Sequence, residues 1–141
     1  MIEINNLTTN PVDEEFLKKT AKMVLEGEHP PLGRVPEEPD LSIALVGQGR
    51  MRELNKKYRR KNRTTDVLAF PSEEIGLGEI VICLKEIKKN AKRYETTFKK
   101  ELSKVLIHGI LHLLGCDHEK NKMETEKMEK KEKYYLAQLT K

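Results

Sequence analysis

The segment that most constrains the fold is FKKELSKVLIHGILHLLGCDH, residues 98–118. Over residues 98–114, apolar side chains recur at the i, i+3, i+4 spacing of one helix face, and further leucines and isoleucines occupy the other side. A helix that is apolar nearly all round is stable only when other elements cover it. We therefore expect a central helix over residues 98–114. It should end at Gly115, where a residue without Cβ lets the chain reverse.

The remaining segments predict an α+β fold, with a small mixed β-sheet of about four strands and about five helices. Strands are expected at residues 2–5, 41–47, 66–71 and 77–83, and helices at 11–27 (capped by Asn10), 50–60, 85–95, 98–114 and 119–139. The apolar run 41–47 predicts a strand buried on both faces, and a helical crossover to the next strand would make the sheet partly parallel. With 141 residues, we expect a single domain, residues 1–141.

Three of the four histidines, His108, His112 and His118, lie in the central segment. His108 and His112 are one helical turn apart, and a reversal at Gly115 would bring His118 back toward them. Imidazoles buried on such a helix need polar partners, and a shared metal ion supplies them at once. Three protein ligands and one open position are typical of catalytic zinc. We predict one Zn²⁺ per chain; a chance grouping of three unconnected histidines is the alternative.

Two residues beside the third histidine leave alternatives open. Cys116 could act as a fourth ligand and make the zinc structural, although it lies in a tight turn between two ligands. Asp117 could orient an imidazole through a hydrogen bond, or it could cap the last helix.

The histidine spacing matches the zinc signature H-E-x-x-H-x-x-G-x-x-H of the metzincin peptidases, which predicts a minimal metzincin-like zinc hydrolase with a central H-x-x-x-H helix. The position of the peptidases' general-base glutamate is occupied by Gly109. Amide hydrolysis requires that base. A reaction that uses the zinc-bound water directly does not need the base, because zinc lowers the pKa of that water to about 7. The absence of the glutamate therefore weighs against a peptidase.

A second motif is a run of basic residues ahead of the predicted strand 66–71. Six of the ten residues 54–63 are cationic: Lys56, Lys57, Arg59, Arg60, Lys61 and Arg63. Lysine and arginine contacts to phosphates dominate nucleic-acid affinity, and the net charge of +4 suits an anionic partner. A solvated helix face is the alternative. Tyr58 and Asn55 could contribute a stacking surface and an amide, or Tyr58 could pack inward.

Taken together, the stretches LNKKYRRKNRTTDVLAFP, LGEIVIC and HGILHLLGCDH resemble the YbeY family of bacterial metal-dependent endoribonucleases. The resemblance covers roughly residues 40–120. It implies zinc at His108, His112 and His118, and an essential arginine at Arg59. It also implies cleavage of single-stranded RNA, 3′-end maturation of 16S rRNA on the small ribosomal subunit, and ribosome quality control. Three residues depart from the family pattern: Ala69, Glu79 and Cys116.

Within this interpretation, Arg59 would pair with phosphoryl oxygens, because its planar fork matches their geometry. The other five cations would hold the flanking RNA backbone: Lys56, Lys57, Arg60, Lys61 and Arg63. Two further classes remain possible: a non-catalytic RNA-binding assembly factor with a structural zinc, and another metallohydrolase such as a peptidase. No apolar run approaches the ~18–20 residues that span a bilayer, and the N-terminus lacks a secretory pattern. We therefore expect a cytoplasmic protein without a membrane partner.

Overall fold

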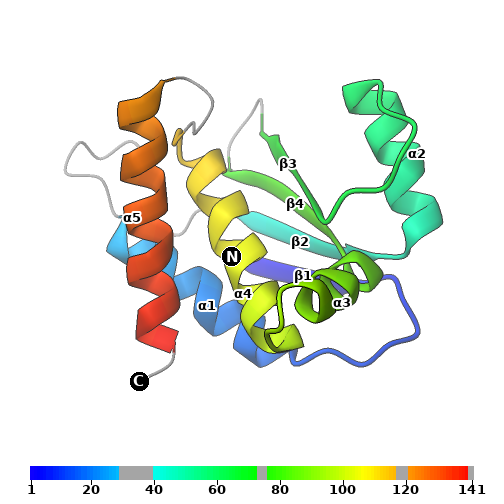
Figure 1. Cartoon of the computed structure of the whole chain (residues 1–141), viewed down its shortest axis with the longest axis horizontal. Helices are drawn as coiled ribbons and strands as arrows, with labels where there is room; N and C mark the ends of the chain where they lie inside the picture. Colours follow the sequence, from blue (N-terminus) through cyan, green and yellow to red (C-terminus); the bar gives the residue numbers. More distant parts are fainter. Residues whose placement is uncertain (29–39, 73–75, 117–120, 140–141) are drawn as a thin grey trace.

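The computed structural model describes residues 1–28, 40–72, 76–116 and 121–139 (Figure 1). These residues form a four-stranded sheet and five helices, which confirms the predicted α+β class. In chain order the elements are β1 (Ile2–Asn6), α1 (Glu14–Gly27), β2 (Leu41–Val46), α2 (Gln48–Arg59), β3 (Val67–Pro71), β4 (Gly78–Cys83), α3 (Leu84–Arg93), α4 (Phe98–Leu113) and α5 (Lys122–Leu139). Among these described helices, none is both long and apolar enough to cross a membrane.

The sheet has the strand order β1-β2-β4-β3, with β1, β2 and β4 parallel and β3 antiparallel to β4. The mixed sheet and the β3–β4 hairpin are therefore as predicted. The expectation that the crossover through α2 gives the parallel pair is wrong, because β3 lies beyond β4 and runs antiparallel to it, and the parallel partners of β2 are β1 and β4. Four consecutive residues of β4 are buried, so it takes the centre, whereas β3 ends at Pro71, which suits an edge.

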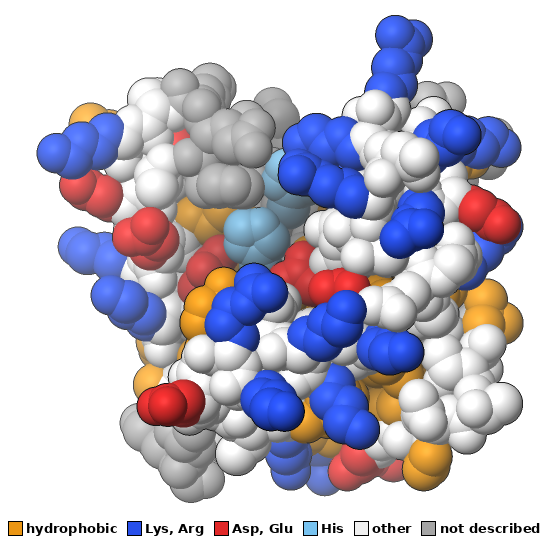
Figure 2. All heavy atoms as spheres, turned by 45° about the vertical axis from the view of Figure 1, so that its right-hand side comes forward, with side chains coloured by type: hydrophobic (Ala, Val, Ile, Leu, Met, Phe, Trp, Pro, Cys, Tyr) orange, Lys and Arg blue, Asp and Glu red, His pale blue; other side chains and the backbone are white. Residues whose placement is uncertain are grey.

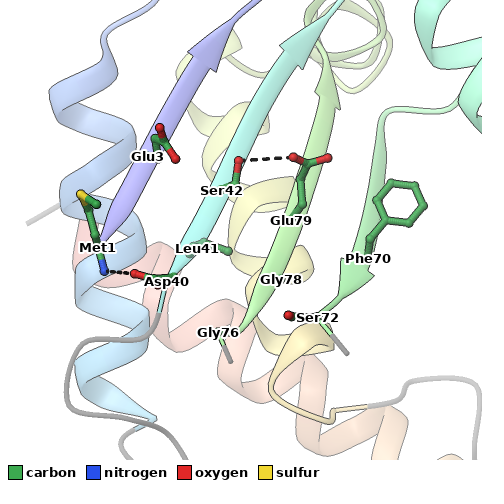
Figure 3. Close-up of a pocket in the computed structure, with 10 residues that line it drawn as sticks. All are labelled: Met1, Glu3, Asp40, Leu41, Ser42, Phe70, Ser72, Gly76, Gly78 and Glu79. Atoms are coloured by element: carbon green, nitrogen blue, oxygen red, sulfur yellow. Dashed lines mark hydrogen bonds and ion pairs between the residues drawn. The ribbon is translucent and has the colours of Figure 1, made fainter. Parts of the chain in front are cut away.

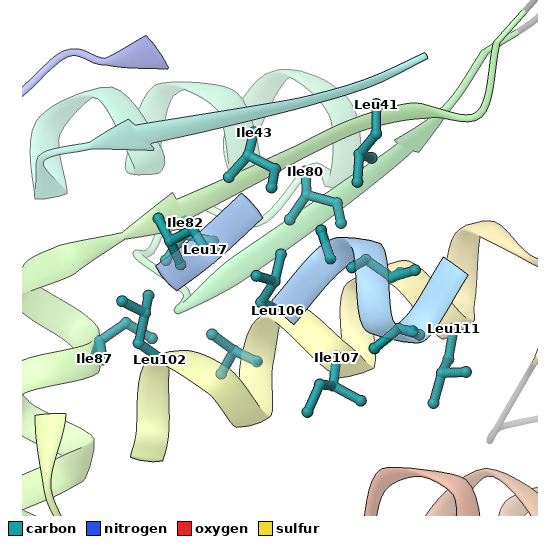
Figure 4. Packing of buried hydrophobic residues seen from close by; sticks show 14 of the residues in the cluster. Leu17, Leu41, Ile43, Ile80, Ile82, Ile87, Leu102, Leu106, Ile107 and Leu111 are labelled. Carbon is teal, nitrogen blue, oxygen red and sulfur yellow. The ribbon is translucent and has the colours of Figure 1, made fainter. Parts of the chain in front are cut away.

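The two faces of the sheet bury separate apolar clusters. On one face Ile43, Ile80 and Ile82 pack against Leu106 and other side chains of α1 and α4 (Figure 4). On the opposite face a smaller cluster lies beneath α2, formed by Ala44, Val46, Met51, Leu68, Val81 and Cys83. β2 contributes to both clusters, which confirms the prediction that this strand is buried on both sides.

Helix α4 is central, as its sequence predicts. Nine of its residues are buried: Glu101, Leu102, Ser103, Val105, Leu106, Ile107, Gly109, Ile110 and Leu111. After the first turn, a single stripe of polar side chains reaches the surface, and we call it the histidine stripe: Lys104, His108 and His112. His108 is half-buried and His112 is exposed. The expectation that both imidazoles are buried is therefore wrong, because other residues of the helix, most of them apolar, take the covered positions.

The end of α4 follows the predicted reversal. Gly115 has φ +101°, a conformation that glycine tolerates best. Its N–H donates to the carbonyl oxygen of His112 at 3.1 Å, and the N–H of Cys116 donates to that of Leu111 at 3.0 Å. This pair of hydrogen bonds is a Schellman motif, which satisfies carbonyls that the helix end would leave unpaired. The chain turns directly after the histidine stripe; His118 lies outside the described residues.

The first helix begins later than predicted. Asp13, not Asn10, is its N-cap, and the Asp13 side chain accepts a hydrogen bond from the Phe16 N–H at 3.0 Å. The acidic Glu14 and Glu15 follow in the first turn, where they interact favourably with the helix dipole. The carbonyl of Asn10 instead accepts from the side chain of Asn6 at 2.7 Å.

The last helix is fixed to the end of α1. Tyr135 and Met128 are its buried residues, and the Tyr135 ring covers Gly27. The Tyr135 hydroxyl donates to Oε2 of Glu28 at 2.6 Å, and Lys131 donates to Oε1 of Glu28 at 2.5 Å. Burial, followed by this hydrogen bond, raises the pKa of Tyr135, so the phenol remains a donor near neutral pH. The position of α5 is therefore set by one carboxylate and one aromatic ring.

This packing predicts the effect of a methyl group at Gly27. A Cβ there would lie within 3 Å of three Tyr135 ring and hydroxyl atoms, so Gly27→Ala must displace α5. We expect a loss of about 1–3 kcal/mol in the free energy of unfolding, measured by urea denaturation. Gly49→Ala is the control, since no atom lies within 4 Å of its Cβ position, and it should cost little. Equal stability of the two variants would contradict the described packing.

Candidate functional site

Histidine side chains lie at the bottom of a hollow on one face of the molecule, and lysine and arginine side chains gather around it (Figure 2). His108 and His112 come from the one stripe of α4 that reaches the surface. Helix geometry places them one turn apart on the same side. The rigidity of the site follows from the helix that carries it, because α4 is clamped by core contacts on its other sides.

The ring of His108 contacts a carboxylate from another helix. Its Nδ1 lies 2.6 Å from Oε1 of Glu132 on α5. Nothing in the sequence around His108 indicates this partner, which is 24 residues away. One local signal could have pointed to Glu132. It lies four residues after Met128 and three before Tyr135, so it is a charged residue on the same helix face as the two buried ones.

The described residues supply two of the three predicted metal ligands. Within residues 1–28, 40–72, 76–116 and 121–139, no group of three or more His, Cys, Asp and Glu side chains gathers as a metal site. The predicted third ligand, His118, and the neighbouring Asp117 lie outside those ranges. Two imidazoles one turn apart, one of them held by a carboxylate, nevertheless fit the ligand chemistry of zinc and related ions.

Cys116 is placed for packing. Its side chain is half-buried and lies against the main apolar cluster, as is usual for the residue that follows a Schellman glycine. Burial raises the pKa of its thiol, which disfavours the thiolate.

Packing also explains why position 109, where the peptidases have a glutamate, is a glycine. Gly109 faces the sheet, and a Cβ on it would lie 3.2 Å from Cδ1 of Ile80. A longer side chain would be forced against the centre of the sheet. The residue after His108 therefore serves the contact between helix and sheet, and it is not a place from which a carboxylate reaches the hollow.

The six predicted RNA-binding cations are all exposed, at the last turn of α2 and in the following loop: Lys56, Lys57, Arg59, Arg60, Lys61 and Arg63. Within the described part of the chain, none of them forms a salt bridge with an acidic side chain. Their charge is therefore available to an external anion. Whether they bind RNA stays a prediction.

Two buried contacts hold the loop that carries the last of these cations. Asn55 is 2% exposed, and its Nδ2 donates to the carbonyl oxygen of Arg63 at 2.9 Å. The Thr64 hydroxyl donates to Oε1 of Glu86 at 2.8 Å, and Gln48 donates to the same oxygen at 2.9 Å. The hydrogen bond from Gln48 is the main reason that the pKa of Glu86 is lowered. Asn55 is thus a structural residue of the loop and has no amide to offer RNA.

Tyr58 is exposed rather than packed inward. It is 56% exposed, and its ring meets Phe70 of β3 in an edge contact with centroids 5.0 Å apart. Lys57 lies 5.3 Å from the same ring. An exposed aromatic ring beside cations is a surface on which a nucleic-acid base can stack.

A pocket of about 500 Å³ lies on the sheet face opposite α1 and α4, beside the first residues of β1, β2 and β4 (Figure 3). Phe70 and the carboxylates of Glu3 and Glu79 line it, and the Ser42 hydroxyl donates to Glu79 at 3.3 Å. The sheet separates this pocket from α4. Its acidic lining makes it a poor place for an RNA backbone, so we do not assign the proposed chemistry to it.

Proteins of known family match this chain over most of its length. The sequence model of the family described as Endoribonuclease YbeY matches residues 3–140. Endoribonuclease YbeY of Thermodesulfovibrio yellowstonii is 48% identical over 105 residues, which cover 70% of this chain but only 66% of that protein. The protein of the same name from Thermotoga neapolitana is 37% identical over 126 residues, covering 89% of this chain and 82% of that protein.

The fold also has a solved counterpart. The solution structure of a Thermotoga maritima protein is similar to this chain with a TM-score of 0.67 and 34% sequence identity. The similarity covers 96% of this chain and 87% of that one. The arrangement of sheet and helices described above is thus shared with an experimental structure.

The buried amide of Asn55 generates a prediction about the basic loop. Asn55→Ala removes the hydrogen bond from a buried amide to the Arg63 carbonyl, which should cost about 0.5–1.5 kcal/mol of stability. Thermal unfolding monitored by circular dichroism measures this cost. Asn62→Ala is the matched control, because Asn62 lies in the same loop and is exposed. If both variants have the melting temperature of the wild type, Asn55 does not hold the loop.

Proposed function

The chain belongs to the YbeY endoribonuclease family, and from that premise we propose that it is a metal-dependent endoribonuclease that cleaves single-stranded RNA. The observation that carries this proposal is the hollow in Figure 2, where histidines and carboxylates lie at the bottom and lysine and arginine side chains lie along part of its rim. A metal site inside a positive surface suits a phosphodiester substrate. Because double-stranded RNA is a stiff rod, single strands enter such a hollow more readily.

His108, His112 and His118 are the proposed ligands of one Zn²⁺. The metal would supply a Lewis acid and lower the pKa of bound water to about 7. Two observations support this assignment: the first two histidines share the exposed stripe of a rigid helix, and the Schellman turn reverses the chain three residues before His118. The packing of Gly109 against Ile80 weighs against a peptidase, since it leaves no room for the general-base carboxylate.

Arg59 is the proposed catalytic cation of this chain. It lies in the last turn of α2 and its guanidinium is exposed. A planar guanidinium can donate two parallel hydrogen bonds to phosphoryl oxygens, and it stabilises negative charge that develops there in the transition state. Lys56, Lys57, Arg60, Lys61 and Arg63 would hold phosphates on either side of the cleaved bond.

The biological substrate that we propose is ribosomal RNA. Maturation of the 3′ end of 16S rRNA and quality control of the small ribosomal subunit, both in the cytoplasm, are what family membership supports. The exposed cations of α2 and its loop support binding to a large folded RNA, where several phosphates can be contacted at once. The whole chain, residues 1–141, would act as a single domain.

A sharp prediction concerns Arg59. Arg59→Ala should lower kcat for cleavage of a single-stranded RNA by about 100-fold or more, with an unchanged melting temperature because the side chain is exposed. Arg59→Lys should also be poor, since an ammonium cannot reproduce the bidentate contact. Arg52→Ala is the control, because Arg52 is an exposed arginine nearer the start of the same helix. Full activity of Arg59→Ala would remove this residue from the mechanism.

The metal proposal has its own test. Elemental analysis of the purified chain should find about one zinc per chain, and His112→Ala should lose it without loss of stability, because His112 is exposed. Lys104→Ala on the same stripe should keep it. A chelator should abolish cleavage of single-stranded RNA, and casein should stay intact throughout. If the chelator unfolds a protein that never cleaved RNA, the chain is an RNA-binding assembly factor with a structural metal.

A further inference from the structure

Glu132 is a carboxylate on the face of α5 that packs toward α4. Its Oε1 lies 2.6 Å from Nδ1 of His108, and the two side chains are 20% and 33% exposed. Partial burial reduces the competition from water, so the hydrogen bond is stronger than one at an open surface. The sequence assigns no role to this residue, and the proposed chemistry does not use it.

We propose that Glu132 is a positioning residue that keeps the proton of His108 on Nδ1 and directs Nε2 toward the metal. An ionised carboxylate has no proton to donate, so the contact requires that Nδ1–H of His108 is the donor. A neutral imidazole carries one N–H, and a metal therefore meets the lone pair of Nε2. A carboxylate that accepts the N–H of a metal-binding histidine orients the imidazole ring and raises its basicity. This inference rests on the proposed metal function.

The residues next to Glu132 on α5 make contacts that fix where its side chain lies. One residue before it, Lys131 binds Glu28 at 2.5 Å, and three residues after it, Tyr135 binds the same carboxylate at 2.6 Å. The hydrogen bond to Glu28 is the main reason that the pKa of Lys131 is raised, so the Lys131 ammonium stays protonated near neutral pH. Met128, one turn earlier, is 1% exposed. Contacts on both sides thus fix the helix register at which Glu132 faces His108.

The rival explanation is that Glu132 only ties α5 to α4. Both explanations predict that Glu132→Ala lowers stability, so a melting temperature cannot separate them. Only the positioning role predicts a change in where the His108 proton resides and in how tightly the metal is held. The experiment therefore reads these two properties directly.

The first measurement is the ¹⁵N NMR spectrum of the His108 ring in the full chain after zinc is removed. Wild type should show the Nδ1–H form, and Glu132→Ala should move toward the Nε2–H form that an unconstrained neutral histidine side chain prefers. Glu132→Gln should stay near wild type, because its amide oxygen still accepts the hydrogen bond. Should removal of zinc unfold the chain, the dissociation constant of zinc separates the two explanations.

The second measurement is the dissociation constant of zinc, obtained by competition with a chromophoric chelator. Glu132→Ala should weaken binding by about 10- to 100-fold, and Glu132→Gln by less. Glu129→Ala, exposed on the same helix, should match wild type in both measurements.

Unchanged proton position and zinc affinity in Glu132→Ala, with only a lower melting temperature, would reduce Glu132 to a tie between helices and overturn the inference. Zinc uptake by the wild type is read separately. If the wild type binds no zinc, the proposed metal function fails on its own, and Glu132 then has no metal toward which it could direct a ligand.

Discussion

The burial of α4 is the constraint on which the rest of the structure depends. Its apolar side chains point in nearly every direction, so the sheet, α1, α3 and α5 must all be placed around it. What they leave uncovered is the histidine stripe. The location of the candidate site is therefore a consequence of how the core closes, because after the first turn the histidine stripe lies where the covering elements do not reach.

The candidate site joins two rigid parts of the molecule. One is α4 with α5 behind it, held by the contacts of Glu28 with Lys131 and Tyr135. The other is the end of α2 with its loop, held from below by Asn55 and Glu86. Because β3 follows the loop and packs against α4, the two parts are also connected through the sheet. Cations and histidines can thus keep a fixed relation to one another, which orientation of a phosphodiester requires.

Sequence periodicity was sufficient for the class of the fold, the central helix and its reversal at Gly115. Those features depend on local spacing, as in residues 98–114. It failed for the place of β4 between β2 and β3, which depends on contacts between distant segments. It also failed for the cap of α1, where Asp13 displaced Asn10 in a local competition. Glu132, Asn55 and Glu86 act through partners 8 to 24 residues away, which no short pattern records. The third predicted ligand, His118, stays a prediction.

The same division of α4 into covered positions and one polar stripe governs how this helix can diverge among related sequences. A substitution at a covered position meets the core, and one at His108 or His112 meets the proposed metal site. Substitutions with little effect on packing or on the site are expected chiefly in the first turn, where Phe98, Lys99 and Lys100 are exposed. Evolutionary drift in this helix should therefore be concentrated at its beginning, and the remaining turns should evolve slowly even if selection on catalysis were relaxed.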